Sequence, residues 1–324
     1  MIPLVTRLVG IVLCAACAAA GAQTFSAKPV RIVVPFAPGG TSDVLARLLG
    51  PRLGDALGTT VVVENKPGAN GNIGAEQVAK SAPDGHSLVL MDVGNLAISP
   101  AIFPKLPFSV GRDFAPVTLI SYTPHLLVVR PDLGVARVAD LIAMARAHPG
   151  KLNYATTGLG SAPHMAGLLL AVSHDLKWVD ISGKGGADSI MHVMSGQADL
   201  LFNGMVATLP HVKSGKLRLL AVSSEKRVAA LPEVPTVAEA TGAKNFVTGS
   251  WQGLLAPAGT PKPALDRLQA EIARLFKVPE VAERLAALGA DPVGNRPEEM
   301  AAWLGNEMQR WSEVVRRTGF RLEQ

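Results

Sequence analysis

Two glycine-rich loops carry the residues best suited to bind a small molecule. The first spans residues 35–43 (PFAPGGTSD), in which Gly39 and Gly40 allow the backbone to approach a ligand closely. Thr41 or Ser42 can cap the helix that follows, and the N–H groups of a first helical turn point outward at its positive end. The loop therefore suits an anion, although an ordinary capped strand–helix turn has the same composition.

The second loop spans residues 155–164 (ATTGLGSAPH) and again falls between an expected strand and an expected helix. It offers three hydroxyl groups and two glycine N–H groups, from Thr156, Thr157, Ser161, Gly158 and Gly160. Because this loop belongs to the other half of the chain, the two loops together could hold a carboxylate or dicarboxylate from both sides. His164 fits a structural role at the helix start more readily than a ligand contact, and both interpretations stay open.

A third short loop, residues 182–186 (SGKGG), contains a single charged residue. Lys184 follows an expected strand there, so that its ammonium group could face an anion. A lysine that is simply solvated is the alternative interpretation.

Enzyme signatures do not accompany these loops. The sequence has no G-x-S-x-G elbow, no H-E-x-x-H motif, no Walker A motif and no zinc spacing. Its seven histidines are scattered without partners at metal-ligand spacing. We therefore expect a binding protein with no catalytic residue, no cofactor and no metal. An enzyme on an α/β fold is the rival class.

Length and composition agree with a two-domain binding protein. The chain has 324 residues, of which 48% are hydrophobic and 18% charged, and this suffices for two cores. The net charge is +5, but the basic residues are dispersed and aromatic residues make up only 5%. A nucleic-acid surface would concentrate its positive charge, so we expect no nucleic-acid partner. We expect a monomer.

The N-terminal residues have the pattern of a secretory signal peptide. Arg7 precedes an apolar stretch, residues 8–20, that is too short for an ordinary membrane span. Residues 20–22 (AGA) then offer a cleavage site before Gln23. We therefore expect residues 1–22 to be removed and the mature protein to be periplasmic.

The two cysteines of the chain, Cys14 and Cys17, both fall within this signal segment. A mature chain that begins at Gln23 would contain no thiol and no disulfide. Lipidation of Cys17 is the alternative, but the usual Leu-like residue of a lipobox is missing before it.

The elements expected to position the loops alternate between strands and helices. Hydrophobic periodicity predicts strands at 31–36, 61–65, 87–93, 117–122, 126–130, 152–156, 178–182, 200–202, 217–222 and 250–256. Helices are predicted at 43–57, near 73–80, at 138–147, from about 163, and from roughly 297 to 317. Pro51 should kink or divide the first of these helices. This order predicts an α/β fold with mainly parallel sheets.

Taken together, several segments closely resemble the Bug/TctC family, the extracytoplasmic receptors of tripartite tricarboxylate transporters. The resemblance runs from residue 28 to 320 and includes RIVVPFAPGGTSDVLARLL, HPGKLNYATTGLGSAPHMAG, LPHVKSGKLRLLAVSS and LLAPAGTP. It implies a two-lobed, type II periplasmic-binding fold with the ligand cleft between the lobes. Residues 23–124 plus 223–324 would form lobe 1, and residues 125–222 would form lobe 2.

The resemblance also implies a function, partners and a set of contacts. The chain would capture a small carboxylate-containing ligand and deliver it to integral membrane subunits of a tripartite tricarboxylate-type transporter. A periplasmic partner of a signalling receptor is the alternative. By position, the implied ligand contacts are Phe36, Ala37, Gly40, Thr41, Asp43, Thr157, Gly158, Ser161, Ala162, Lys184 and Asn203.

Three positions depart from the pattern of this family. Gly183 stands where a tyrosine is common, and Asn203 stands where an aspartate is common. We expect the first change to enlarge the cavity and both to favour a bulkier acid, or one without an α-amino group. Asp92 lies in a turn that is usually rich in Gly, Thr and Ser, and it would return a negative charge to the cleft.

Overall fold

The structure is a computed structural model that describes residue 25 and residues 28–103, 105–243 and 246–320. The expected signal peptide, with Cys14, Cys17 and the cleavage site before Gln23, lies outside the described residues. Within the described ranges, no helix is both long and apolar enough to cross a membrane.

The strands form a ten-stranded sheet that divides into two halves. Their bounds are β1 Val30–Val34, β2 Val61–Asn65, β3 Ser87–Asp92, β4 Phe114–Val129, β5 Asn153–Thr156, β6 Val179–Ser182, β7 Leu200–Gly204, β8 Arg218–Val222, β9 Gly249–Pro257 and β10 Asp291–Pro292.

Helices connect and cover these strands. They are α2 Thr41–Leu57, α3 Asn72–Ala79, α4 Ser99–Ile102, α5 Val110–Asp113, α6 Val138–Ala147, α7 Ala162–His174, α8 Gly186–Met194, α9 Met205–Lys213, α10 Val237–Thr241, α11 Lys262–Leu275, α12 Pro279–Ala287 and α13 Pro297–Thr318. Short 3-10 turns span Ala69–Gly71 (η2) and Pro131–Leu133 (η4), and a π-helical turn, η3, spans Gly94–Ile98.

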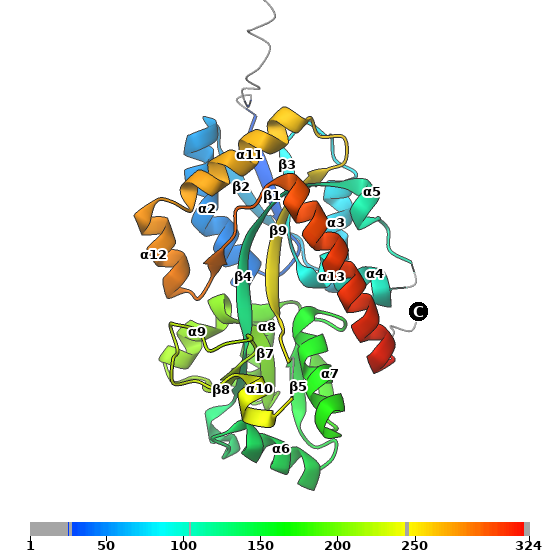
Figure 1. The fold of residues 1–324 in the computed structure, drawn as a ribbon, viewed down its shortest axis with the longest axis vertical. Coiled ribbons are helices and arrows are strands. Elements are labelled where there is room, and N and C mark those ends of the chain that lie inside the picture. The colour runs from blue at the N-terminus through cyan, green and yellow to red at the C-terminus, as the bar shows by residue number, and fades with distance from the viewer. Residues whose placement is uncertain (1–24, 26–27, 104, 244–245, 321–324) are drawn as a thin grey trace, which may run out of the picture.

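Strand β4 runs through both halves of the sheet (Figure 1). Its first part pairs with β9, next to the parallel strands β3, β1 and β2. Its last part pairs with β7 and β8, and β7 continues in parallel to β5 and β6. Parallel strands joined by helices confirm the predicted α/β class, and the continuous strand joins the two halves without a flexible linker.

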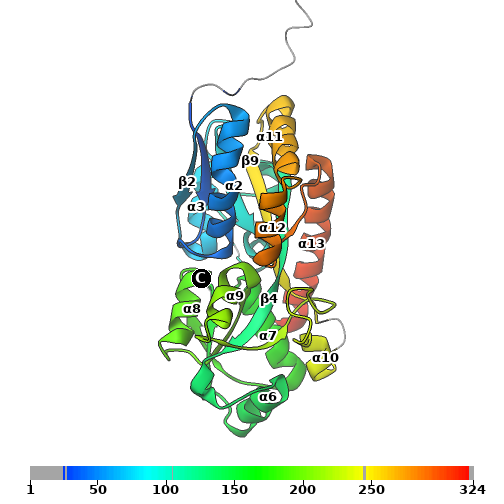
Figure 2. The same ribbon diagram turned by 90° about the vertical axis from the view of Figure 1, so that its left-hand side faces the viewer.

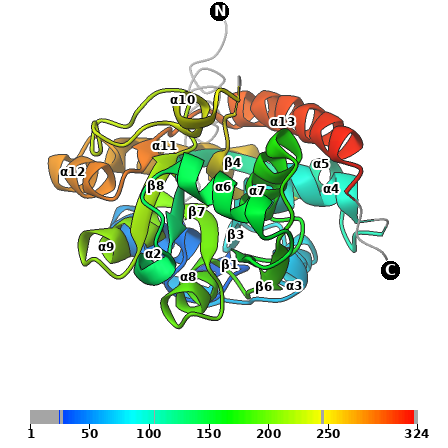
Figure 3. The same ribbon diagram turned by 90° about the horizontal axis from the view of Figure 1, so that it is seen from below.

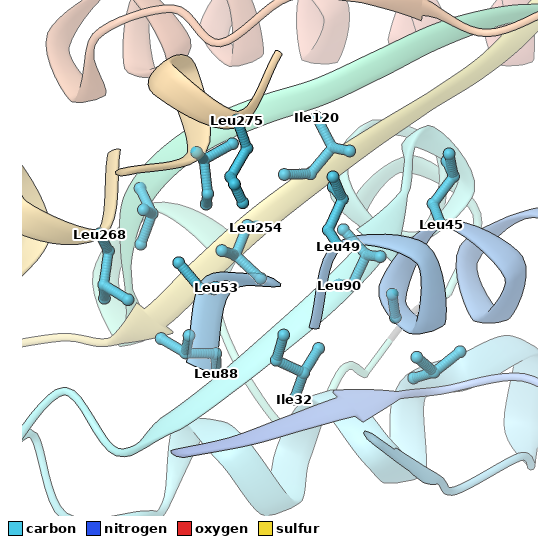
Figure 4. Packing of buried hydrophobic residues seen from close by; sticks show 14 of the residues in the cluster. Ile32, Leu45, Leu49, Leu53, Leu88, Leu90, Ile120, Leu254, Leu268 and Leu275 are labelled. Carbon is cyan, nitrogen blue, oxygen red and sulfur yellow. The ribbon is translucent and has the colours of Figure 1, made fainter. Parts of the chain in front are cut away.

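Each half has its own hydrophobic core. In the first half, α2 and α11 pack leucines against β1, β3, β4 and β9, as Figure 4 shows for Leu45, Leu49 and Leu268 among others. In the second half, α6, α7 and α10 pack against β4, β5, β7 and β8. The parallel strands of each half are therefore covered on their faces, as parallel sheets require.

The two halves lie one above the other with their parallel strands facing across a common boundary. In Figure 2, α8 and α9 lie directly below α2 and α3, and α13 runs along the opposite side. The view from below shows the second half stacked over the first (Figure 3). The loops after β1, β3, β5 and β7 are consequently brought to the boundary between the halves.

Two expectations about the elements are corrected. Helix α2 continues through Pro51, which excludes the division that was expected as the alternative to a kink. The two strands expected at 117–122 and 126–130 are a single strand, β4, because Pro124 pairs with Gly249 at the point where β4 passes between the halves.

Candidate functional site

A small cavity of about 40 Å³ lies at the boundary between the halves. Its walls come from the ends of strands and the starts of helices in both halves. The lining residues are Phe36, Gly40, Thr41, Ser42, Asn70, Asp92, Gly94, Thr157, Ser161, Pro163, Gly186, Asn203, Ser250 and Gln252. Nine of these fourteen residues have polar side chains, and most of the nine are buried.

Three helices begin at this cavity. Gly40 is the N-cap of α2, Ser161 is the N-cap of α7, and Gly186 is the first residue of α8. The unpaired N–H groups and the positive end of each helix dipole lie at these termini. Because α2 belongs to the first half and α7 and α8 to the second, an anion in the cavity would be approached from both sides.

Six of the residues implied by the family resemblance meet in this lining. They are Phe36, Gly40, Thr41, Thr157, Ser161 and Asn203. The other five do not line it: Ala37, Asp43, Gly158, Ala162 and Lys184.

Asp43 supports the first loop from behind. Its carboxylate accepts hydrogen bonds from the N–H of Gly39 at 2.9 Å, from Nε of Arg47 at 2.9 Å and from Nδ2 of Asn65 at 2.9 Å. Burial opposes its ionisation, but these hydrogen bonds outweigh burial and hold the pKa of Asp43 below its usual range. Asp43 therefore fixes the shape of the loop.

The expected side-chain cap of α2 is wrong. The N-cap is Gly40, which has no side chain to accept a hydrogen bond, and the hydroxyl of Ser42 instead donates to Oε1 of Gln252 at 2.5 Å. In α7 the cap is conventional, because the hydroxyl of Ser161 accepts from the N–H of His164 at 3.3 Å.

Lys184 lies at the boundary through its backbone. Its carbonyl accepts a hydrogen bond from the N–H of Ala37 at 3.3 Å, and its N–H donates to the carboxylate of Asp188 at 2.8 Å. The side chain of Lys184 is exposed and borders a neighbouring cavity. Ala37 and Lys184 thus join the two halves directly.

This neighbouring cavity has a volume of about 550 Å³ and is more apolar. Phe36, Asn70 and Thr157 line both cavities, so the two adjoin one another. The rest of its wall is Pro35, Pro67, Gly68, Ala69, Gly71, Phe103, Gly158, Leu159, Ser182, Gly183 and Lys184.

The expectation that the missing side chain at Gly183 enlarges the cavity is wrong. A Cβ atom at Gly183 would lie 2.7 Å from Oγ of Ser189 and 3.1 Å from the carbonyl oxygen of Thr156. It would therefore point into the protein, and the packing of this loop requires glycine there.

Sequence patterns missed several residues of the cavity wall. Ser250 and Gln252 are two residues apart and therefore lie on the same face of β9. Asn70 belongs to the η2 turn. The alternation of side chains along a strand indicates only weakly that Ser250 and Gln252 share a face, because it applies to every pair of residues two apart. Only the pairing of β9 with β3 places that face beside Asp92.

Asp92 lies at the end of β3 and is buried. Its Oδ1 accepts from the N–H of Gly94 at 2.9 Å, and its Oδ2 accepts from Nε2 of Gln252 at 2.8 Å. Burial raises the pKa of Asp92 to about 6, although hydrogen bonds from Gly94, Ser250 and Gln252 act in the opposite direction. The expected placement of Asp92 at the cleft is confirmed.

Two histidines near the boundary have structural partners. His164 is buried, with Nδ1 accepting from the N–H of Gly160 at 3.1 Å and Nε2 3.3 Å from the carboxylate of Asp180. Nδ1 of His125, on β4, lies 3.1 Å from Oγ1 of Thr248. Burial lowers the pKa of His125 to about 3, so its ring is neutral at physiological pH.

A cavity of about 990 Å³ lies elsewhere in the molecule, along β4 and α13. Tyr122, Trp251, Trp311 and Arg310 form part of its wall. It shares no lining residue with the two cavities described above. Among the described residues, Met205 at the start of α9 is the one helix start after a parallel strand that reaches this cavity, whereas three helix starts meet at the small cavity. We therefore assign the candidate site to the small cavity.

Comparisons with known proteins agree with this geometry. Protein BugT of Bordetella pertussis is 37% identical over 303 residues, which cover 93% of each chain. The structure of the periplasmic binding protein BugD matches with 34% identity and a TM-score of 0.88, over 92% of this chain and all of that one. BugD is a periplasmic binding protein, which is a receptor rather than an enzyme.

Two similar structures were solved with acids bound. A protein of R. palustris with adipate is 34% identical, with a TM-score of 0.88 over 90% of this chain and 98% of that one. MatC from Rhodopseudomonas palustris, with bound malate, is 33% identical, with a TM-score of 0.85 over 90% of this chain and all of that one. The family model described as the tripartite tricarboxylate transporter family receptor matches residues 45–320. The chain therefore belongs to the tripartite tricarboxylate transporter receptor family, whose members are periplasmic solute receptors.

Proposed function

We propose that this receptor captures a small carboxylate in the cavity between its two halves and releases it unchanged. The observation that carries the proposal is the meeting of the starts of α2, α7 and α8 at one polar cavity. Backbone N–H groups at helix starts bind carboxylates without a cationic side chain. The acids bound by the two solved relatives, adipate and malate, support the same ligand class.

The sizes of the two adjoining cavities suggest how an acid would lie. The smaller cavity, about 40 Å³, would take the ligand carboxylate at the three helix starts. The larger cavity, about 550 Å³, would take the body of the ligand against Phe36, Phe103 and Leu159. Together they fit an acid with an extended or apolar body.

The proposed motion is closure of two lobes about β4 and β9, as in other hinged binding proteins. The chain would leave lobe 1 near residue 124. We place its return near Gly249 instead of residue 223, because Val237 and Phe246 pack in the hydrophobic core of the second half. The contacts of Ala37 with Lys184 would then form on closure.

A panel of acids tests the proposal. Adipate, malate, tricarboxylates, aromatic acids and amino acids are compared by thermal shift and by calorimetry. We expect one site per chain and a raised melting temperature, because the ligand binds only the folded state. Recovery of a chemically altered acid in proportion to the protein would contradict a receptor without turnover.

The substitution Thr157→Val tests whether the ligand binds in this cavity. The change keeps the volume of Thr157 but removes its hydroxyl from the cavity wall. Loss of one hydrogen bond of about 1 kcal/mol should weaken binding roughly fivefold. Thr60→Val, on an exposed residue outside the cavity, is the matched control. Equal affinities for both variants would place the ligand elsewhere.

We further propose that the chain is exported, with cleavage before Gln23, and acts as a monomer. It would present its ligand to the integral membrane subunits of a tripartite tricarboxylate-type transporter. N-terminal sequencing of periplasmic protein, light scattering and co-purification with the membrane subunits test these three points. Diacylglycerol on Cys17 would contradict the soluble mature form.

A further inference from the structure

The cavity proposed to hold an acid has an unexpected charge. Among its lining residues, all of which belong to the described part of the chain, Asp92 is the one charged side chain, and no Lys, Arg or His takes part. A ligand carboxylate and the Asp92 carboxylate would therefore share a buried space without a cationic side chain. Two carboxylates in such a space cannot both stay ionised without a large cost.

We propose that the receptor takes up one proton at Asp92 when it binds its acid, so that protonated Asp92 donates a hydrogen bond to a ligand carboxylate. This inference rests on the proposed function, because it assumes that the acid occupies this cavity. In the cavity, the reaction balances as one ligand carboxylate plus one ionised Asp92 plus one proton from the solvent, giving a carboxylate–carboxylic acid pair that carries one negative charge; any second carboxylate of the ligand keeps its own charge.

The surroundings of Asp92 are arranged so that it can hold a proton. Its carboxyl group is fixed by Gly94 and by Gln252, whose amide is fixed in turn by Ser42. Burial already brings the pKa of Asp92 to about 6 in the ligand-free receptor. A second negative charge in the same cavity raises this pKa further, and the proton is then bound at neutral pH.

Titratable groups on the neighbouring elements do not supply a compensating positive charge. Asp43 on α2 is engaged by Gly39, Arg47 and Asn65. His125 on β4 reaches Ser250 and is neutral because burial lowers its pKa to about 3.

On α7, His164 contacts the N–H of Gly160 and the carboxylate of Asp180. The facing residues of β9 and η3, namely Ser250, Gln252 and Asn95, are uncharged. Within the described residues, the pKa of Asp92 is set by burial and hydrogen bonds, and no charged side chain contributes to it.

Calorimetry with adipate and malate as probes tests the proposal on the full mature chain. Titrations at one pH in buffers of different ionisation enthalpy count the protons exchanged. We expect the wild type to take up close to one proton per ligand at pH about 7.5, and Kd to rise about tenfold per pH unit above about 6. Both acids are almost fully ionised there, because ordinary carboxyl groups have a pKa of about 4.

Two variants test whether Asp92 is the group that binds the proton. Asp92→Asn should bind without proton uptake, with a Kd that hardly changes with pH and is lower than that of the wild type at pH about 8. Asp291→Asn is the control, because partial desolvation also raises the pKa of Asp291, but this exposed residue lies outside the cavity. It should keep the proton uptake of the wild type.

If Asp92→Asn does not fold, the carboxyl carbon of Asp92 can be followed by NMR in the labelled wild type. Its chemical shift should move to the protonated value when adipate or malate is added. Binding by the wild type without proton uptake overturns the proposal, and so does affinity that improves as pH rises, since ionised Asp92 would then accept a hydrogen bond from the ligand. If neither protein binds either acid at any pH, the proposed function itself fails.

Discussion

Nε2 of His125 lies 3.2 Å from Oγ of Ser250, so a residue of the crossing strand β4 is linked to the wall of the cavity. The other ring nitrogen lies 3.1 Å from Oγ1 of Thr248, which precedes β9. The imidazole therefore bridges the two strands that join the halves. The two hydroxyl groups can each donate or accept, so they can satisfy both nitrogens of a neutral ring, and burial keeps the ring of His125 uncharged.

His125→Gln should change how stability depends on pH. The pKa of His125 is about 3 in the folded protein, against an ordinary value of 6.5. The unfolded chain thus binds more protons between these values, and the wild type loses stability as pH falls below about 6.5. At pH 5 the loss is about 2 kcal/mol relative to pH 8. Urea unfolding at pH 5 and pH 8 should show this loss of stability in the wild type and not in the variant. A parallel pH dependence in both would contradict it.

Asp92→Asn should act on stability in the opposite direction. The folded pKa of Asp92 is about 6, raised by burial from 3.8, so the folded protein binds more protons than the unfolded chain between these values. Stability is therefore lost as pH rises from about 4 through 6, by about 3 kcal/mol in total. In the absence of ligand, the free energy of unfolding of the variant should increase relative to that of the wild type as pH rises from 4.5 to 7.5. A constant difference between the two proteins would count against a raised pKa.

Asp43→Asn should weaken the first loop without removing a ligand contact. Asn has a single acceptor oxygen, whereas the Asp43 carboxylate accepts from Gly39, Arg47 and Asn65. At least one of these donors would lose its hydrogen bond, at a cost of about 1 kcal/mol. The melting temperature should fall, and affinity should fall with it because the start of α2 is displaced. An unchanged melting temperature would contradict this role for Asp43.

Gly204→Ala should oppose closure of the two halves. A Cβ atom at this position would lie 2.5 Å from Oγ1 of Thr41, a contact between β7 and α2. The backbone of Gly204 suits alanine, with φ −55° and ψ 134°, so the variant should fold normally. Overpacking costs about 1–3 kcal/mol in the closed form, which raises Kd at least about fivefold. Calorimetry with the best acid of the panel measures the change.

Gly305→Ala is the matched control for this variant. Gly305 is exposed on α13, and a Cβ atom there would meet nothing within 4 Å. Alanine in an exposed helix should raise the free energy of unfolding by about 0.5–1 kcal/mol and leave Kd unchanged. Equal loss of affinity in Gly204→Ala and Gly305→Ala would remove the argument about closure.

Local patterns predicted many elements of the fold closely. The helix expected at 138–147 and the strand expected at 61–65 have the predicted bounds, and the last helix ends one residue beyond its predicted end. Each has a periodicity that is complete within its own segment. Helices α8 and α9 were not identified, because each has only nine residues and they include Gly186 and Pro210, respectively, which disfavour a helix.

The sequence by itself determined the family, the α/β class and the two loops that bring helix starts toward a common cavity. The class and the loops follow from glycine, hydroxyl and apolar residues whose spacing is read along a few neighbouring positions. The family follows from the resemblance of whole segments along residues 28–320. Only the tertiary structure decided that Asp43 and Lys184 turn away from the cavity while Ser42, Asp92 and Gln252 meet there. The physical reason is that the pairing of β3 with β9, formed between segments about 160 residues apart, selects which side chains share a face.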